Sequence, residues 1–162
     1  MFSRQLLQLA EVALERARAQ GLRIATAESC TGGLVGALLT EIAGSSDVFE
    51  RGLITYSNCA KSDLLGVPQE LIAEAGAVSE AVARSMAEGA VQRAEAQLAV
   101  AVTGIAGPGG GTPLKPVGLV HIAAAREGSA TLHEMHLFGD VGRSSIRRQS
   151  VEAALRLLLR LF

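Results

Sequence analysis

The chain has 162 residues, which is enough for one domain with a full core and too few for two generous ones. Its 15 Lys and Arg residues nearly balance its 16 Asp and Glu residues, and this argues against a nucleic-acid partner. Trp is absent and aromatic residues make up 3%, so we expect a core of Ala, Val, Leu and Ile, as in covered parallel sheets.

Helical and strand patterns alternate along the chain. In order, they predict a helix that ends at Gly21, a strand over 21–25, a polar turn over 26–33, a helix that ends at Gly44, a strand over 49–56, a short helix that ends before Gly66, and a helix over 69–75. There follow a helix from Ser79 to Ala94, a strand over 97–103, a glycine-rich loop over 104–111, a hairpin of strands over 117–126 and 131–138, and a helix over about 143–161. The predicted fold class is therefore α/β, a three-layer α/β/α sandwich around a mixed, mostly parallel sheet, as one domain over residues 1–162.

Small and polar residues, Thr26–Gly33, join the first predicted strand to its helix. Such a turn aims backbone N–H groups and the positive end of a helix at one point, which suits an oxyanion or a phosphate. Ser29 is a candidate nucleophile there; alternatively, Ser29 or Thr31 only caps the helix. Cys30 is a rival nucleophile, because a helix N-terminus would lower the pKa of its thiol.

Three predicted strands end in polar or glycine-rich segments. If these strands are parallel, the segments meet at one edge of the sheet. The segments carry Ser29, then Tyr56, Asn58 and Lys61, then Thr103 with the glycine-rich loop. Lys61 can act as the base for Ser29 if burial or nearby cations lower the pKa of its amine. Tyr56 either orients this pair, lines the pocket or packs against the strand.

The histidines and cysteines are not predicted to hold a metal ion. His121, His133 and His136 fall within the predicted hairpin, with no carboxylate or thiol at ligand spacing. Cys30 and Cys59 follow neither a zinc nor a disulfide spacing, so we expect reduced thiols. The first residues lack the apolar run of a secretory signal, and no apolar segment is long enough to span a bilayer. We therefore expect a cytoplasmic protein without a membrane partner.

Several cations could pair with a phosphate group. Arg143, Arg147 and Arg148 lie around the start of the last predicted helix, and Lys115 lies beside the glycine-rich loop. A solvated helix face explains Arg147 and Arg148 equally well. Arg143 is the better candidate, because it stands at the entrance of the helix.

A series of motifs runs in order from about Leu6 to the last predicted helix. They are Thr26–Gly33, Gly44–Ser46, Tyr56–Asn58 with Lys61, Gly76–Ser79, Thr103–Pro108 and Lys115–Gly118. With these motifs the chain resembles the CinA C-terminal domain family. That family includes nicotinamide-nucleotide amidohydrolases, which convert nicotinamide mononucleotide and water to nicotinate mononucleotide and ammonia in pyridine nucleotide recycling. Many members carry an upstream domain, so the chain resembles the stand-alone form.

The resemblance implies roles for particular residues. It implies that Ser29 is the nucleophile and Lys61 its general base, with supporting roles for Tyr56 and Thr103 and a role for Arg143 in the site. It also implies that the enzyme needs no metal or other cofactor and forms a homodimer or a higher homo-oligomer. We expect nicotinamide mononucleotide to be the substrate.

The expected substrate contacts come from the turn, the second strand end, the glycine-rich loop and the last helix. They are Glu28, Thr31, Gly32, Gly33, Asn58, Gly104, Ile105, Gly107 and Arg143. In this hypothesis the N–H groups of Thr31, Gly32 and Gly33 stabilise the oxyanion. The rival hypothesis is a non-catalytic nucleotide-binding or regulatory module, in which the glycine turns hold a phosphate and Ser29 is a helix cap.

Overall fold

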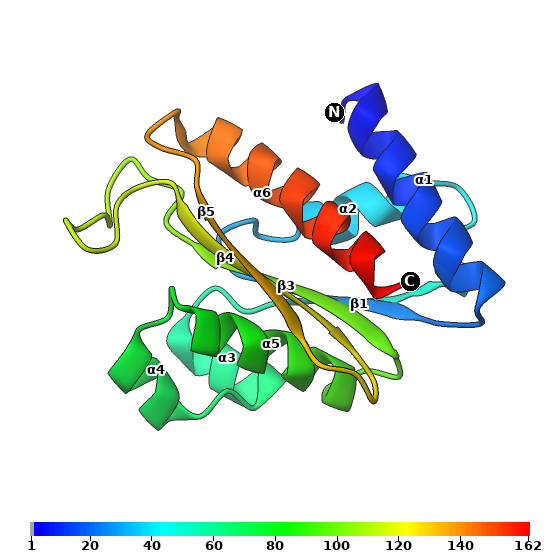
Figure 1. The fold of residues 1–162 in the computed structure, drawn as a ribbon, viewed down its shortest axis with the longest axis horizontal. Coiled ribbons are helices and arrows are strands. Elements are labelled where there is room, and N and C mark those ends of the chain that lie inside the picture. Colours follow the sequence, from blue (N-terminus) through cyan, green and yellow to red (C-terminus); the bar gives the residue numbers. More distant parts are fainter. Residues whose placement is uncertain (1) are drawn as a thin grey trace.

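The computed structural model describes residues 2–162, and these form a five-stranded sheet with helices on both faces (Figure 1). The strands are β1 (Ile24–Glu28), β2 (Phe49–Ile54), β3 (Leu98–Gly104), β4 (Leu119–Arg126) and β5 (Leu132–Leu137). The helices are α1 (Arg4–Ala19), α2 (Leu34–Thr40), α3 (Asn58–Leu65), α4 (Gln69–Ala75), α5 (Glu80–Arg93) and α6 (Arg143–Leu158), with short 3-10 helices at Ser45–Asp47 and Leu159–Leu161. No helix within residues 2–162 has both the length and the apolar character to cross a membrane.

The strands follow the order β2-β1-β3-β4-β5. β1 pairs in parallel with β2 and β3, whereas β4 pairs antiparallel with β3 and β5. β4 therefore runs against the other strands of the sheet, and the predicted mixed, mostly parallel sheet is confirmed. The carboxyl ends of β1, β2 and β3 meet at one edge, where Glu28 lies level with Ile54 and Val102.

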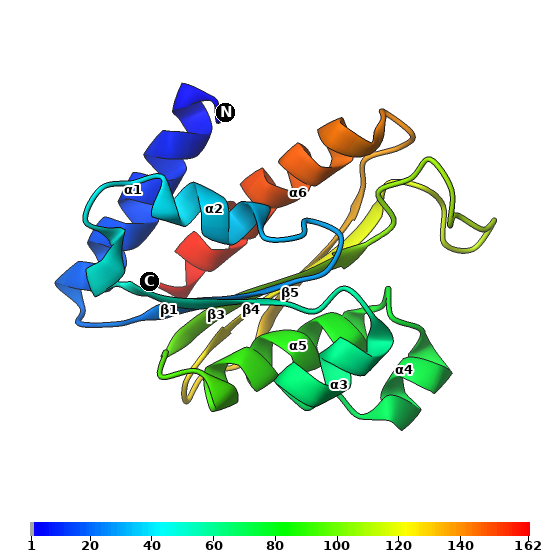
Figure 2. The same ribbon diagram turned by 180° about the vertical axis from the view of Figure 1, so that it is seen from behind.

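Two sets of helices cover the two faces of the sheet, which confirms the predicted three layers. α1, α2 and α6 pack on one face and α3, α4 and α5 on the other; Figure 2 shows this arrangement from behind. Side chains of β3 alternate between the faces, with Val100 and Val102 in the core beneath α6 and Ala99 and Ala101 in the core beneath α5. Because alanine is small, α5 can lie close to the sheet.

Two predicted boundaries in the first half of the chain are wrong. β1 covers Ile24–Glu28 and not 21–25. The polar character of Thr26 and Glu28 suggested a turn, but both side chains are buried within the sheet. α2 ends at Thr40 and not at Gly44; a turn over 41–44 and the 3-10 helix Ser45–Asp47 then lead into β2. The other predicted elements lie within three residues of their observed bounds.

Candidate active site

A serine and a lysine meet at the edge where the parallel strands end. Ser29 directly follows β1, and Lys61 lies in α3, the helix that follows β2. The Lys61 Nζ atom is 3.1 Å from Ser29 Oγ. It also lies 2.9 Å from the carbonyl oxygen of Thr55 and 3.4 Å from that of Tyr56. Lys61 is 1% exposed and Ser29 is 9% exposed, so this contact is shielded from bulk water.

The surroundings of Lys61 favour its neutral form. Burial lowers the pKa of the Lys61 amine from its ordinary value, because the charged form loses its hydration. A neutral amine has two hydrogens and one lone pair. The carbonyl oxygens of Thr55 and Tyr56 can accept the two hydrogens, and the lone pair then faces Ser29 Oγ. This arrangement can take a proton from the Ser29 hydroxyl.

Local sequence and helix packing hold Lys61 in place. Ser57 caps α3, with its Oγ accepting a backbone N–H at 3.0 Å. Gly66 ends α3 in the left-handed conformation, at a φ of 70°. α3 lies against α5 at Gly89, which has no side chain, and the carbonyl of Leu65 comes close to it there. The helix that carries Lys61 is therefore fixed against the second layer.

The Glu28 carboxylate binds the N-terminus of α2. Glu28 is 1% exposed, and its oxygens accept three backbone N–H groups, including that of Gly33, at 2.9 to 3.0 Å. Its negative charge lies at the positive end of the helix, which stabilises the helix. The Gly32 N–H donates to the Ser29 carbonyl at 3.0 Å. The Glu28 carboxylate and the N–H groups of Gly32 and Gly33, all three predicted substrate contacts, therefore already have hydrogen-bond partners within the turn.

Two other N–H groups of this turn have no hydrogen-bond acceptor within it. Within residues 2–162, the N–H groups of Cys30 and Thr31 donate no hydrogen bond. The Cys30 side chain packs in the core beneath α6, and burial raises the pKa of its thiol to about 11. The expected lowering of this pKa is wrong, because burial has a larger effect than the helix end. The thiolate is disfavoured, and Ser29 is the better nucleophile.

Arg143 bridges two of the strand-end segments. It is the first residue of α6, and its guanidinium donates to the Tyr56 hydroxyl at 3.0 Å and to the Gly107 carbonyl at 2.8 Å. Tyr56 is 62% exposed, so its ring does not pack within the strand layer. These residues link the end of β2 to the glycine-rich loop and form a polar rim at the edge that carries Ser29.

Thr103 and Lys115 anchor the loop that follows α4. Thr103 is 1% exposed, and its hydroxyl donates to the Ala77 carbonyl at 2.8 Å. The Lys115 amine donates to the carbonyl of Ala75, the last residue of α4, at 2.7 Å and to that of Val78 in the loop at 2.9 Å. Lys115 therefore does not join Arg143 in a phosphate-binding cluster; its amine holds the loop.

The remaining predicted contact residues differ in their surroundings. Asn58 is the first residue of α3 and is exposed. Gly104 and Ile105 continue the pairing with β4: the Ile105 N–H donates to the Leu119 carbonyl at 2.9 Å, and a Cβ at Gly104 would overlap β4. Gly104 is thus needed for close packing, while the Asn58 side chain is accessible at the surface.

Arg147 contacts the turn that carries Ser29, over residues 29–33, which we call the nucleophile turn. Nothing in the sequence indicated this contact. The Arg147 guanidinium donates to the carbonyl of Cys30 at 3.1 Å and to that of Thr31 at 2.7 Å. Arg148, the next residue, is exposed, as the solvated helix face predicts. Helical periodicity gives no signal for the Arg147 contact, because its partner Cys30 is 117 positions away in the sequence.

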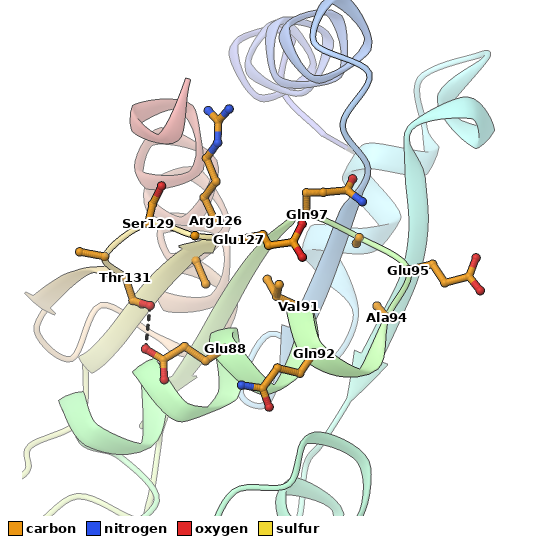
Figure 3. Close-up of a pocket in the computed structure, with 14 residues that line it drawn as sticks. Glu88, Val91, Gln92, Ala94, Glu95, Gln97, Arg126, Glu127, Ser129 and Thr131 are labelled. Carbon is orange, nitrogen blue, oxygen red and sulfur yellow. Dashed lines mark hydrogen bonds between the residues drawn. The ribbon is translucent and has the colours of Figure 1, made fainter.

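A wide hollow of about 760 Å³ lies at the opposite end of the sheet (Figure 3). It lies between the end of α5 and the turn that joins β4 to β5, with Glu88, Gln92 and Arg126 among its lining residues. The Thr131 hydroxyl donates to Glu88 across it at 2.7 Å. No predicted site residue lines this hollow, and its lining offers no lysine beside a serine. It is therefore not the candidate active site.

Comparisons with known proteins agree on one family. The model of the CinA C-terminal domain matches residues 6–162. CinA-like proteins of Akkermansia muciniphila and Syntrophobacter fumaroxidans are both 53% identical to the chain, over 86% and 94% of its length. The matched regions make up 34% and 35% of those proteins, so the chain spans about a third of the length of these curated relatives.

Solved structures of relatives share the fold over nearly the whole chain. The competence/damage inducible protein CihA from Agrobacterium tumefaciens has a TM-score of 0.97 at 50% identity and covers 99% of this chain and 98% of its own. A CinA superfamily protein from Escherichia coli has a TM-score of 0.92 at 32% identity and covers 100% of this chain and 94% of its own.

Proposed function

The chain belongs to the CinA C-terminal domain family, and from this premise we propose that it hydrolyses the carboxamide of nicotinamide mononucleotide to nicotinate mononucleotide and ammonia. The observation that carries the proposal is the 3.1 Å contact between Lys61 Nζ and Ser29 Oγ. A serine nucleophile needs a base, and a buried amine of lowered pKa is suited to that task. A module that only held a phosphate would have no need of an amine buried beside a serine.

The first half of the reaction makes an acyl-enzyme. Ser29 Oγ bonds to the carboxamide carbon while its proton moves to Lys61 Nζ. The substrate oxygen becomes negative and accepts the N–H groups of Cys30 and Thr31; one such donor typically contributes roughly 3 kcal/mol to the transition state. Lys61 then gives the proton to the amide nitrogen, the carbon–nitrogen bond breaks, and ammonia leaves. The pyridine ring is already cationic, so its amide carbon is more electrophilic than that of an ordinary amide.

The second half of the reaction returns the enzyme to its starting state. A water molecule attacks the nicotinoyl ester and gives a proton to Lys61. The ester bond breaks, Ser29 Oγ takes the proton from Lys61, and nicotinate mononucleotide is released. Every proton in this cycle passes through the same amine, and this is why its lone pair must face Ser29.

The polar rim binds the nucleotide part of the substrate in this proposal. Arg143 offers a fork of N–H donors that suits a phosphate, and the amides of the loop over 104–111 add neutral donors. Tyr56 holds the Arg143 guanidinium at 3.0 Å and limits its range of motion. Asn58, exposed at the start of α3, is placed to bind a ribose hydroxyl.

Ammonia release from nicotinamide mononucleotide tests the proposal. We expect the wild type to be active and Ser29→Ala and Lys61→Met to lose roughly 10³-fold or more in kcat. Cys59→Ala is the matched control, because Cys59 is an exposed residue of α3 close to Lys61, and it should keep the wild-type rate. Mass spectrometry of protein trapped with substrate should find a nicotinoyl group on Ser29.

Two outcomes would overturn the proposal in different ways. If the wild type is active and both variants keep near-full rates, Ser29 and Lys61 are not the catalytic pair. If calorimetry detects binding of nicotinamide mononucleotide but no ammonia forms, the non-catalytic nucleotide-binding hypothesis takes its place.

A further inference from the structure

Arg147 donates both of its hydrogen bonds in the structure to the nucleophile turn. The acceptors are the consecutive carbonyls of Cys30, at 3.1 Å from Nε, and Thr31, at 2.7 Å from Nη2. Within residues 2–162, no carboxylate lies within ion-pair distance of Arg147. The guanidinium charge is therefore directed at two peptide groups of the turn and not at an acidic side chain.

These two carbonyls determine where the neighbouring N–H groups point. The C=O of Cys30 and the N–H of Thr31 belong to one planar trans peptide, so they point in opposite directions. A donor on the carbonyl side therefore holds the Thr31 N–H on the far side, away from Arg147. In the same way, the Thr31 carbonyl and the Gly32 N–H share one peptide, and that N–H donates to the Ser29 carbonyl at 3.0 Å.

The turn needs such a restraint because glycine follows. Gly32 and Gly33 have φ values of 59° and 95°, and glycine has access to both signs of φ. The Thr31–Gly32 peptide, which borders a glycine, can therefore rotate at little steric cost. The Cys30–Thr31 peptide precedes it, and the contact of Arg147 with the Cys30 carbonyl holds it in the observed orientation. A rotated Cys30–Thr31 peptide would present a carbonyl oxygen where an oxyanion needs an N–H donor. A Cβ at Gly32 would lie 3.4 Å from Arg147 Nη2, so the guanidinium lies directly against this peptide.

We infer that Arg147 is a positioning residue of the catalytic site, which holds the Thr31 N–H in the orientation that stabilises the oxyanion. This inference rests on the proposed acyl-transfer function. Arg147 contacts neither the substrate nor Ser29 Oγ in this role; it acts through the backbone. Its charge also polarises the two peptide groups, which makes their N–H groups stronger donors.

The experiment compares Arg147→Gln, Arg147→Ala and the wild type in steady-state ammonia release. Loss of an oxyanion donor acts on the transition state, so we expect kcat to fall roughly 10²-fold while KM changes less than about 3-fold. Added guanidinium ion should restore part of kcat in Arg147→Ala and none in Arg147→Gln. Arg156→Gln is the control, because Arg156 is an exposed arginine of the same helix and pairs with Glu152, away from the turn.

The results separate a positioning role of Arg147 from a role in folding alone, and separate failure of this inference from failure of the proposed amide hydrolysis. An unchanged kcat, or a fall in kcat matched by the loss of folded protein with no rescue by guanidinium, would overturn it. If the wild type releases no ammonia, the proposed function fails. Acylation of Ser29 by p-nitrophenyl acetate then tests the role of Arg147 separately, because attack on an ester also forms an oxyanion. Arg147→Gln should then slow acylation by a similar factor, and equal rates, or no acylation of the wild type, would refute the inference.

Discussion

Burial of a lysine side chain costs free energy, because a charged amine loses its hydration. Lys61 is 1% exposed and has the carbonyls of Thr55 and Tyr56 and the Ser29 hydroxyl as hydrogen-bond partners. The two carbonyls offset part of this cost. Among residues 2–162 no carboxylate forms an ion pair with Lys61, so no negative charge holds the proton on its amine. At the scale of the residue, this environment lowers the pKa of the amine, so Lys61 loses a proton more readily than an exposed lysine does.

The lowered pKa of Lys61 predicts a pH dependence of catalysis. Below the pKa in the folded protein the amine is protonated and cannot take the Ser29 proton, so activity is lost as the pH falls through that value. We expect the profile of kcat/KM against pH to show an acid limb with an apparent pKa below the ordinary lysine value of 10.5. Cys30→Ala should keep this limb. A limb that disappears with Cys30 would assign the titration to the thiol.

At the scale of the element, the N-terminus of α2 is stabilised by one buried carboxylate. Glu28 belongs to β1, and it accepts three N–H groups at the helix N-terminus, which have no partner within the helix itself. The same bonds hold the turn on which Ser29 lies. A strand and a helix are thus connected through a side chain as well as through the chain itself.

Replacement of this carboxylate should destabilise the protein. Glu28→Gln removes the charge and one acceptor oxygen, so we expect the free energy of unfolding to fall by roughly 2–4 kcal/mol. Urea denaturation followed by circular dichroism measures the change. Glu41→Gln, at the exposed C-terminal end of α2, is the control and should shift the midpoint little. Equal midpoints for the two variants would contradict the structural role of Glu28.

The antiparallel strands β4 and β5 carry an acid-sensitive contact. His121 Nδ1 lies 3.0 Å from His133 Nε2, and His133 Nδ1 lies 3.6 Å from the Glu80 carboxylate. Burial lowers the pKa of both histidines, and charge repulsion from His133 lowers that of His121 further, whereas the Glu80 carboxylate acts in the opposite direction on both. The folded protein therefore holds both rings neutral where the unfolded chain already binds protons.

Because the histidine pKa values are lower in the folded protein than in the unfolded chain, we expect the protein to be less stable in acid. As the pH falls below the ordinary histidine pKa of about 6.5, the unfolded state takes up protons first. The free energy of unfolding should then fall by up to about 1.4 kcal/mol per pH unit for each histidine, until the folded state also titrates. Urea midpoints between pH 5 and 8 measure the slope, and His133→Gln should reduce it. An unchanged slope in that variant would assign the acid effect to other groups.

At the scale of the whole molecule, the distance between layers places the base beside the nucleophile. Ser29 follows a strand of the sheet, whereas Lys61 lies on a helix of the outer layer. The position of α3 depends on α5, where an added Cβ at Gly89 would lie 2.0 Å from the carbonyl oxygen of Leu65. A side chain there would push α3 away from the sheet.

Gly89→Ala therefore tests how packing controls catalysis. Alanine has a higher helix propensity than glycine by about 1 kcal/mol, but the clash with backbone should cost more. We expect a net destabilisation of roughly 1–3 kcal/mol. We also expect a loss of roughly 10²-fold in kcat, because a displacement of about 1 Å is enough to misalign reacting groups. Gln92→Ala, at an exposed position of the same helix, should change neither quantity. A Gly89→Ala variant with full activity would mean that Lys61 does not depend on this packing.

The order of the elements and the position of the site followed from local patterns. Strands that end in polar segments, combined with the rule for parallel sheets, brought Ser29, Lys61 and Tyr56 to one edge. The resemblance to the family then implied that Ser29 is the nucleophile and Lys61 its general base. The same reasoning failed for Glu28 and Cys30, because a residue's type does not reveal whether its side chain faces the core, the turn or the crevice.

The sequence by itself determined the alternation of helices and strands, the residues at the strand ends and the family. These depend on hydrophobic period, glycine positions and short motifs, which are properties of neighbouring residues. Only the tertiary structure decided which N–H groups of the turn already have acceptors, how deeply Lys61 is buried and that Arg147 reaches the nucleophile turn 117 residues away. The physical reason is that burial and hydrogen-bond partners are set by segments distant in the chain, whose contact depends on how the layers pack.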